Sequence, residues 1–299
     1  MQAGNDSWWD RPIMETDKAP LAAVPARNLL VRRVECPEFL TCQPIRVLSK
    51  GMLQRNVAVT GLWKDRSLVN IGPPLKGYPE GELEVVPSTE LQKIRSTITD
   101  STERLYQPKD AIALAENTFA IADLGTNLTG FIGAQIRCSK PTTLYITFDE
   151  ILTQGDVDSK RLGCVNAVCY ELKSGTYNVE SFEPYTMRYL KLNVLTGNCE
   201  VKGLYLREYA NPEVDEASFS CSDPGLNRIF DAARQTFRQN AVDIFMDCPS
   251  RERAGWLCDS FFTSRVAFDL CGNTKIEKNF LENFLLPSSF AYLPEGMLP

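Results

Sequence analysis

The hydrophobic period of this chain changes once, near Asn211-Pro212, and that change limits the architectures open to it. Before this point, apolar and polar residues alternate in short segments, as in strands that bury one face. After it, apolar residues recur at helical spacing. Many short strands separated by turn residues are typical of an antiparallel sandwich. The pattern predicts an antiparallel, jelly-roll-like β-sandwich over residues 29–212, followed by helices in residues 213–299.

The strand pattern is sharpest between residues 115 and 210. An alternating segment at 119–124 is followed by a predicted turn at Gly125–Asn127 and by a second strand at 131–137. In a later segment one face is fully apolar, formed by Leu190, Leu192 and Val194. Further strands are predicted at 144–148, 165–172, 181–182 and 203–209. The weaker pattern before residue 115 predicts a strand at 28–34, then short strands, long loops and a helical turn near 90–96.

Three helices are predicted in the C-terminal segment. Asp223 is suited to cap the first, and Pro224 fits its first turn. The second is predicted over 259–271 and ends at Gly272, and the third begins at the capping-box pattern Thr274-x-x-Glu277. The residues expected on the buried faces are Leu226, Ile229, Phe230, Ala233 and Phe237, then Phe262, Val266 and Leu270, then Ile276, Phe280 and Phe284.

Length and charge exclude several classes of protein. A chain of 299 residues is long enough for about two domains, and residues 1–28 read as an irregular arm or linker that prolines keep from forming a long helix. The net charge of −6 argues against a nucleic-acid partner. No apolar run is long enough to span a membrane, and the polar N-terminus is not expected to be a signal peptide. We expect a soluble protein, cytoplasmic, or periplasmic if a longer parent carries an upstream signal.

The chain contains no histidine, which excludes a Ser-His-Asp site, a Cys-His site and any histidine-ligated metal within it. Acid–base chemistry must then fall mainly to carboxylates, and no metal or cofactor is expected. Ten cysteines are present, none in a CxxC pair, and most are predicted to be buried thiols. Cys248 and Cys258 are expected to pack rather than react, because no histidine is present to activate them.

The densest group of charges lies in the stretch 247–259, DCPSRERAGWLCD. It holds three carboxylates, two guanidiniums and one indole: Asp247, Glu252, Asp259, Arg251, Arg253 and Trp256. No helical apolar pattern runs through it, so it is predicted to be a loop. Such groups suit a sugar, since a carboxylic acid can protonate the glycosidic oxygen and an indole can cover the apolar ring face. The alternative is a solvated network of surface ion pairs, which stabilises little.

The same stretch resembles, without gaps, the acid-bearing loop of glycoside hydrolase family 78, the bacterial α-L-rhamnosidases. One departure is Cys258, which stands where that family usually has glycine. The segments LGTNLTGFIGAQI (124–136) and FEPYTMRYLKL (182–192) resemble the β-sandwich that precedes the family's catalytic domain. That domain is an (α/α)6 toroid, so the resemblance implies that residues 213–299 are only its first helices.

The resemblance implies that Glu252 is the general acid and that Asp247, Arg251, Trp256 and Asp259 bind the rhamnosyl ring. Family members invert the anomeric centre with a base far downstream, and no residue of this chain aligns to that base. We therefore expect this chain to be inactive alone. The implied substrates are terminal α-L-rhamnosides in rhamnose-containing glycans or glycosides.

Other side chains near the stretch also carry expectations. An acid that pairs with arginine is a poor proton donor, so Arg251 and Arg253 are expected to point at Asp247, Asp259 or substrate hydroxyls. Three aromatic residues of the sandwich are expected to pack in its core: Phe182, Tyr185 and Tyr189. Two acidic residues are expected at a solvated strand end, in preference to binding a cation or facing the catalytic domain: Asp149 and Glu150.

Two other functions remain open from the sequence. One is a non-catalytic carbohydrate-binding β-sandwich module with a helical appendage, and the other is a toroid glycosidase with a different sugar specificity. Three amphipathic helices cannot close a toroid, so we also expect an exposed apolar surface and self-association through it.

Overall fold

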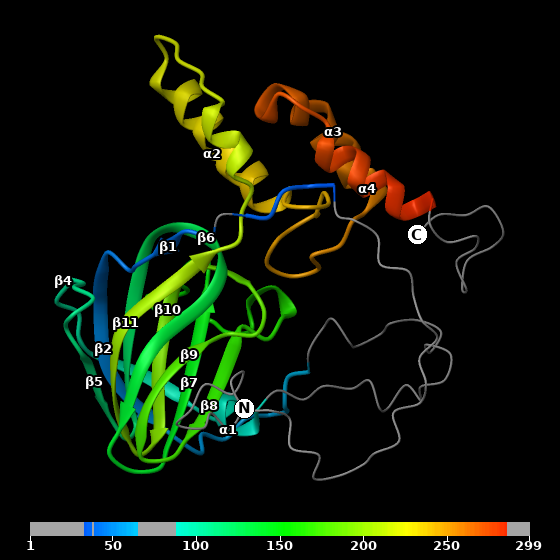
Figure 1. The fold of residues 1–299 in the computed structure, drawn as a ribbon. Coiled ribbons are helices and arrows are strands. Elements are labelled where there is room, and N and C mark those ends of the chain that lie inside the picture. Colours follow the sequence, from blue (N-terminus) through cyan, green and yellow to red (C-terminus); the bar gives the residue numbers. More distant parts are fainter. Residues whose placement is uncertain (1–32, 38, 65–87, 286–299) are drawn as a thin grey trace, which may run out of the picture.

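The computed structural model describes residues 33–37, 39–64 and 88–285 of the chain. An antiparallel sheet comes first and helices follow it (Figure 1), which confirms the predicted fold class. The predicted arm at 1–28, nearly all of the strand at 28–34 and the segment after residue 285 lie outside the described residues. No helix in the described part of the chain is long and apolar enough to cross a membrane.

Eleven strands form the described sheet. They are β1 (Thr41–Cys42), β2 (Arg46–Gln54), β3 (Arg95–Asp100), β4 (Arg104–Leu105), β5 (Ile112–Ala115), β6 (Thr118–Cys138), β7 (Thr142–Asp149), β8 (Ala167–Leu172), β9 (Gly175–Glu180), β10 (Tyr185–Thr196) and β11 (Asn198–Glu208). Short helices α1 (Thr89–Gln92) and η3 (Arg161–Gly163) lie between strands. The strand predicted at 181–182 is absent, because β9 ends at Glu180.

Strand β6 is continuous over 21 residues, so the turn predicted at Gly125–Asn127 is wrong. Gly125 has a φ of 85°, and its N–H donates to Asp123 Oδ1 at 2.7 Å. Glycine adopts this left-handed conformation without strain, so the strand bends here and does not reverse. The half before Gly125 pairs with β2 and β10, and the half after it pairs mainly with β11 and β9.

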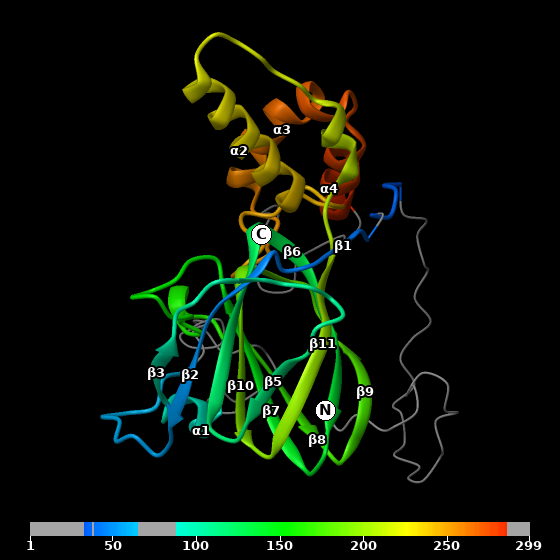
Figure 2. The same cartoon turned by 90° about the vertical axis from the view of Figure 1, so that its left-hand side faces the viewer.

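The two halves of β6 thus belong to two layers, one built on β2, β10, β7 and β8 and the other on β9, β11 and β5. The sheet curls round so that the layers face each other (Figure 2). The main core lies between them, and the predicted inward face is confirmed, since Leu190, Leu192 and Val194 are all 0% exposed. The aromatic prediction is wrong for Phe182, which is 74% exposed, whereas Tyr185 is partly buried against the core.

The C-terminal segment contains η4 (Pro212–Glu216), α2 (Pro224–Asn240), α3 (Leu257–Cys271) and α4 (Lys275–Leu285). Asp223 caps α2 as predicted, accepting from Gly225 N at 2.7 Å. Gly272 ends α3 with a φ of 66°, also as predicted. At the start of α4, the side chain that accepts a backbone N–H is Asn273, bonded to Lys275 N.

The faces predicted to be buried on α2 and α3 are largely exposed, so that prediction is wrong for most of their residues, although Phe237 is buried. Ile229 is 65% exposed and Phe262 is 67% exposed. A smaller core instead gathers residues from several elements: Val34, Val214, Phe237, Ala241, Phe245, Ala267, Ile276 and Phe280. The face predicted for α4 is confirmed, because Ile276 and Phe280 are buried and Phe284 packs against them. The described helices are too few to cover one another's apolar faces.

The helices sit on one end of the sheet (Figures 1 and 2). Gln239, buried at the end of α2, donates to Asn127 O at 2.9 Å and accepts from Thr129 Oγ1 at 2.8 Å. Next to it, Arg238 pairs with Glu208 at the end of β11. These polar contacts fix α2 above the bend of β6. The boundary between domains at residue 212 stays a prediction.

Candidate active site

Residues 247–256 of the charged stretch lie in the loop that joins α2 to α3, as predicted, and residues 257–259 form the first turn of α3. A bridge between Ala241 and Phe245 begins the loop. Phe245 is 1% exposed and lies against Phe237 and Phe280. Because the first residues of the loop are held in the smaller core, the charged residues that follow start from a fixed point.

Asp247 holds the two sides of the loop together. Its backbone N–H donates to Ala254 O at 3.0 Å, and its Oδ1 accepts from Ala254 N at 3.0 Å. The thiol of Cys248 lies 3.2 Å from Asp247 Oδ2. The residue predicted to bind the sugar therefore also closes the loop, and removing its carboxylate would remove one of the two hydrogen bonds between Asp247 and Ala254.

Glu252 and Trp256 are exposed and in direct contact. The indole Nε1 donates to Glu252 Oε2 at 3.0 Å, and 46% of Trp256 is exposed. Arg251 donates to the other oxygen of the same carboxylate, Oε1. The expectation that Arg251 would avoid Glu252 is therefore wrong. The two residues are adjacent in the chain, and Asp247, the expected partner, already accepts from the loop's own backbone.

Arg253 is turned away from the other charges of the loop. It has a φ of 51°, a conformation that is uncommon for arginine. Its Nη1 donates to Pro184 O at 3.0 Å, and its Nη2 donates to Glu183 Oε2 at 2.9 Å. The expectation that Arg253 would face Asp247 or Asp259 is wrong, because it ties the loop to the segment between β9 and β10.

The end of the loop requires a close approach that only glycine allows. A Cβ on Gly255 would lie 2.6 Å from the ring of Phe280. Trp256 follows as the N-cap residue of α3, and Asp259 lies exposed in the first turn of that helix. None of the hydrogen bonds among the described residues joins the Asp259 carboxylate to Asp247 or Glu252. The structure thus brings Glu252, Arg251 and Trp256 together, with Asp259 on the following helix.

Comparison with known proteins shows which proteins this chain resembles. Residues 215–286 match the model of the bacterial alpha-L-rhamnosidase 6 hairpin glycosidase domain. An α-L-rhamnosidase of Formosa agariphila is 26% identical over 164 residues, which are 52% of this chain and 17% of that protein. One of Alteromonas sp. is 25% identical over 146 residues, 47% of this chain and 16% of its own length. These matches support glycoside hydrolase family 78.

Two solved rhamnosidases, one of them of glycoside hydrolase family 78, share the fold. A rhamnosidase of Bacillus sp. GL1 superposes with a TM-score of 0.59 at 24% identity, covering 69% of this chain and 22% of that one. A rhamnosidase of Klebsiella oxytoca, solved with rhamnose bound, gives 0.54 at 17% identity, covering 82% and 43%. The chain thus spans about a sixth of the curated relatives and less than half of either solved chain.

The structure explains how Cys258 can stand where the family 78 pattern has glycine. Cys258 is the second residue of α3 and is not among the described residues with positive φ, so glycine is not needed there. It is exposed, and of the ten cysteines only Cys138 and Cys199 are fully buried. The prediction that most cysteines are buried is therefore wrong. Burial raises the pKa of the Cys199 thiol to about 12.

Two ion-paired contacts of the sandwich were not predicted from the sequence. Asp149 is 0% exposed and accepts from Arg161 Nε at 2.8 Å, while Glu150 accepts from Arg161 Nη2 at 2.8 Å. The expected solvated strand end is therefore wrong. Arg161, the partner of both carboxylates, lies in η3, between β7 and β8, where the sequence shows no recognisable pattern. Glu183 was missed in the same way, since its contact with Arg253 spans 70 residues.

Proposed function

We propose that residues 213–299 form the start of the catalytic domain of an inverting α-L-rhamnosidase, that residues 29–212 form the sandwich before it, and that Glu252 is the general acid. The observation that carries the proposal is the contact of Glu252 with Trp256, which holds an exposed carboxylate beside an exposed indole. A proton donor next to an aromatic platform suits the cleavage of a glycosidic bond. The family match over 215–286, which includes this loop, supports the same assignment.

In the proposed reaction, Glu252 gives its proton to the leaving oxygen as the bond to the anomeric carbon breaks, and water attacks the opposite face of the ring. Both oxygens of Glu252 accept hydrogen bonds in the structure, so one partner has to move. Arg251 is that partner, because a partly exposed ion pair contributes only about 0–1 kcal/mol. Once turned away, it is free to bind a sugar hydroxyl while Trp256 covers the apolar ring face.

Inversion also needs a second carboxylate, about 6.5–9.5 Å from the acid, to activate the water. Asp247 is engaged in closing the loop, and Asp259 is proposed to bind ring hydroxyls. We place the base in a later part of the toroid, as in the family. This chain alone should then release no product from an aryl α-L-rhamnoside, and turnover by the purified chain would contradict that part of the proposal.

The test of the acid is Glu252→Gln in the protein that carries this chain together with the rest of the toroid. The amide keeps the shape and the contact with Trp256 but has no proton to donate. We expect kcat to fall on the order of 10²–10⁴-fold on an alkyl rhamnoside, with little change in sugar affinity. The fall should be much smaller on an aryl rhamnoside whose leaving oxygen is already a weak base.

Two comparison variants separate the acid from its neighbours. Asp259→Asn should weaken binding of rhamnose through lost hydroxyl contacts and lower kcat less than Glu252→Gln does. Glu171→Gln, on an exposed strand position of the sandwich, should change neither. Equal losses on the alkyl and aryl substrates in the Glu252 variant would remove Glu252 from the acid role.

A further inference from the structure

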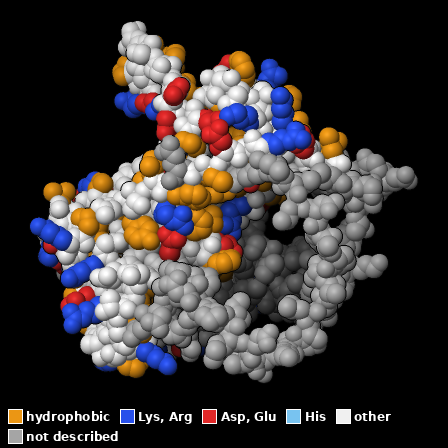
Figure 3. Space-filling model, viewed as in Figure 1, with side chains coloured by type: hydrophobic (Ala, Val, Ile, Leu, Met, Phe, Trp, Pro, Cys, Tyr) orange, Lys and Arg blue, Asp and Glu red, His pale blue; other side chains and the backbone are white. Residues whose placement is uncertain are grey.

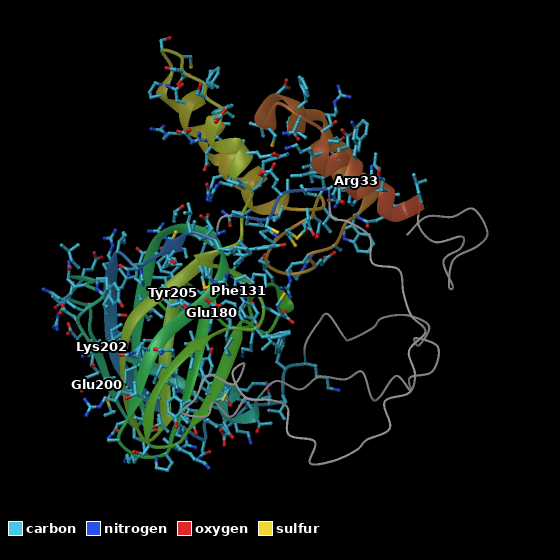
Figure 4. The ribbon with its side chains drawn as sticks, viewed as in Figure 1. Arg33, Phe131, Glu180, Glu200, Lys202 and Tyr205 are labelled. Carbon is cyan, nitrogen blue, oxygen red and sulfur yellow. The ribbon has the colours of Figure 1, made fainter. Side chains whose placement is uncertain are left out.

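In the layer formed by β6, β9 and β11, the side that faces away from the main core carries a group of polar side chains. These residues are distant in sequence from the loop around Glu252. Along β6, β9 and β11, the inward residues fill the main core and the alternate residues point outward. The outward residues used below, which we call the outer face, are Gly133, Gln135, Arg137, Asn178, Glu180, Glu200, Lys202 and Tyr205. Figure 4 shows Tyr205, Lys202 and Glu200 following one another along this side of the sheet.

The ring of Tyr205 lies against the backbone of Gly133, its partner across the ladder. A Cβ on Gly133 would come within 2.0 Å of Tyr205 Cζ and 2.3 Å of its hydroxyl, so the ring lies where a side chain would otherwise stand. Its hydroxyl is bonded to Glu180 Oε2 at 3.0 Å, and Glu180 is itself held by Arg207 at 2.8 and 2.7 Å. The ring is therefore fixed with one side on the sheet, and Tyr205 remains partly exposed.

A groove of about 430 Å³ adjoins this ring. Besides Tyr205, its polar lining comes from Gln135, Asn178 and Lys202, all exposed. Gln135 Nε2 donates to Asn178 Oδ1 at 3.3 Å, so each amide has a second polar atom outside that bond. A fixed aromatic surface beside amide donors and acceptors presents both of the contacts that a sugar ring makes.

A second hollow of about 460 Å³ continues the surface along the same strands. It is lined by Arg137 and Glu200, which face each other across the ladder, and by Asn198. From Gly133 to Arg137 is four residues, or roughly 13 Å of strand. The outer face is thus longer than one sugar ring and suits a short oligosaccharide.

Charge on the outer face is balanced. Glu180 is matched by Arg207, and Arg137 and Glu200 lie 3.9 Å apart. On the side of the molecule in Figure 3, basic and acidic side chains likewise lie next to one another, between hydrophobic ones. A surface of alternating sign does not attract a polyanion such as a nucleic acid. A neutral, hydroxyl-rich ligand matches it better.

We propose that the outer face of β6, β9 and β11 is a second saccharide-binding site, in which the Tyr205 ring stacks on a sugar and Gln135, Asn178 and Lys202 bind its hydroxyls. The site is separate from the loop around Glu252 and does not need catalysis. Only the choice of sugar for the test, an α-linked oligosaccharide of L-rhamnose, rests on the proposed function.

The experiment is saturation-transfer NMR of that oligosaccharide on the full chain carrying Trp256→Ala, which removes the platform of the loop. We expect this variant to keep a clear saturation-transfer signal. Adding Tyr205→Ala should reduce the signal at least fivefold. Adding Phe182→Ala, a 74% exposed aromatic elsewhere on the sandwich, should leave it unchanged. No signal in the Trp256→Ala chain, or equal signals with and without the Tyr205 ring, would overturn the proposal.

Tyr205→Ala also removes a hydrogen bond to Glu180, so loss of fold has to be separated from loss of binding. Gln135→Ala and Asn178→Ala change exposed side chains and should lower the signal while the melting temperature stays constant. An unchanged signal in both would count against the site. If the proposed rhamnosidase activity were wrong, the Glu252→Gln assay would show it. The saturation-transfer signal of the Trp256→Ala chain would be unaffected, so the two failures can be told apart.

Discussion

The sandwich and the helical segment use apolar residues in opposite ways. In the sandwich, the inward residues of both layers meet, and the largest fully buried side chains other than Phe245 all lie there. In the helices, Ile229, Phe261, Phe262 and Phe268 are each more than half exposed. The comparison teaches that an amphipathic pattern only identifies an apolar face. Burial requires a second face, and the sandwich provides its own whereas the described helices do not.

The largest difference between the two regions is expected when an apolar side chain is removed from each. Leu192→Ala removes a side chain with 0% exposure between the two layers and should lower the free energy of unfolding by about 2–5 kcal/mol. Phe262→Ala removes a larger side chain that is 67% exposed and should change it by less than about 0.5 kcal/mol. Urea unfolding followed by circular dichroism measures both. Similar losses in the two variants would mean that Phe262 is covered in solution.

Acid should act on the sandwich through Asp123, which is 2% exposed and bonded to Arg188 at 2.9 and 3.2 Å. Burial raises the pKa of its carboxyl, but the Arg188 hydrogen bonds, the Gly125 N–H and nearby Arg46 outweigh burial and bring the pKa below 3.8. A carboxyl with a lowered pKa in the folded state stabilises the protein above its unfolded pKa. That stabilisation is lost as the pH falls through the lower value.

Asp123→Asn should therefore lower stability at pH 6 by about 1–3 kcal/mol and flatten the fall in melting temperature below about pH 4. Asp269→Asn, at an exposed position of α3, is the matched control and should leave the acid profile unchanged. Melting temperatures between pH 6 and pH 2 give the comparison. An acid profile that is as steep without Asp123 as with it would assign the acid sensitivity to another group.

Exposed apolar faces on α2 and α3 should make the chain self-associate when it is purified alone. Sedimentation velocity should show a weight-average mass that rises with protein concentration, and Phe262→Lys should shift the distribution severalfold toward monomer. Phe182→Lys, on the sandwich, should not, although Phe182 is just as exposed. A concentration-independent monomer for the unchanged chain would mean that these faces do not drive association.

The smallest expected effect is at the start of α2. Asp223→Ala removes the side chain that accepts from Gly225 N and should cost about 0.5–2 kcal/mol of helix stability. The sheet does not depend on this cap, so amide exchange should accelerate in α2 and stay unchanged in β10. Faster exchange in both regions would show that the two parts open together.

Local patterns were sufficient for much of the fold. The order of strands and helices, the inward face of β10, the start of α2 and the end of α3 follow from periodicity, capping and glycine, all of which act within a few residues. The continuity of β6 was missed because Gly125-Thr-Asn also suits a turn. Whether such a segment bends or reverses is decided by its neighbours, β2, β10 and β11, which are distant in sequence.

In the candidate site, too, features set by neighbouring residues could be predicted and features set by distant residues could not. The stretch was selected for its residue types, and the structure places Glu252 in contact with Trp256 within it. The roles assigned to these residues stay predictions. The direction of its arginines was not predictable, since it depends on Asp247 being engaged by Ala254 and on Glu183 and Pro184 standing beside Arg253. A contact between residues 70 positions apart produces no pattern in the spacing of neighbouring residues.

The single strand that belongs to both layers has a consequence for the order in which the chain can fold. During synthesis, β6 emerges long before the strands that complete it, since β10 and β11 end at Thr196 and Glu208. Pairings between distant segments form slowly, because long loops must close first. The nascent sandwich therefore remains open until residue 208 has left the ribosome, and α2, which is held by Thr129 and Asn127 of β6, has a surface to dock on only after that.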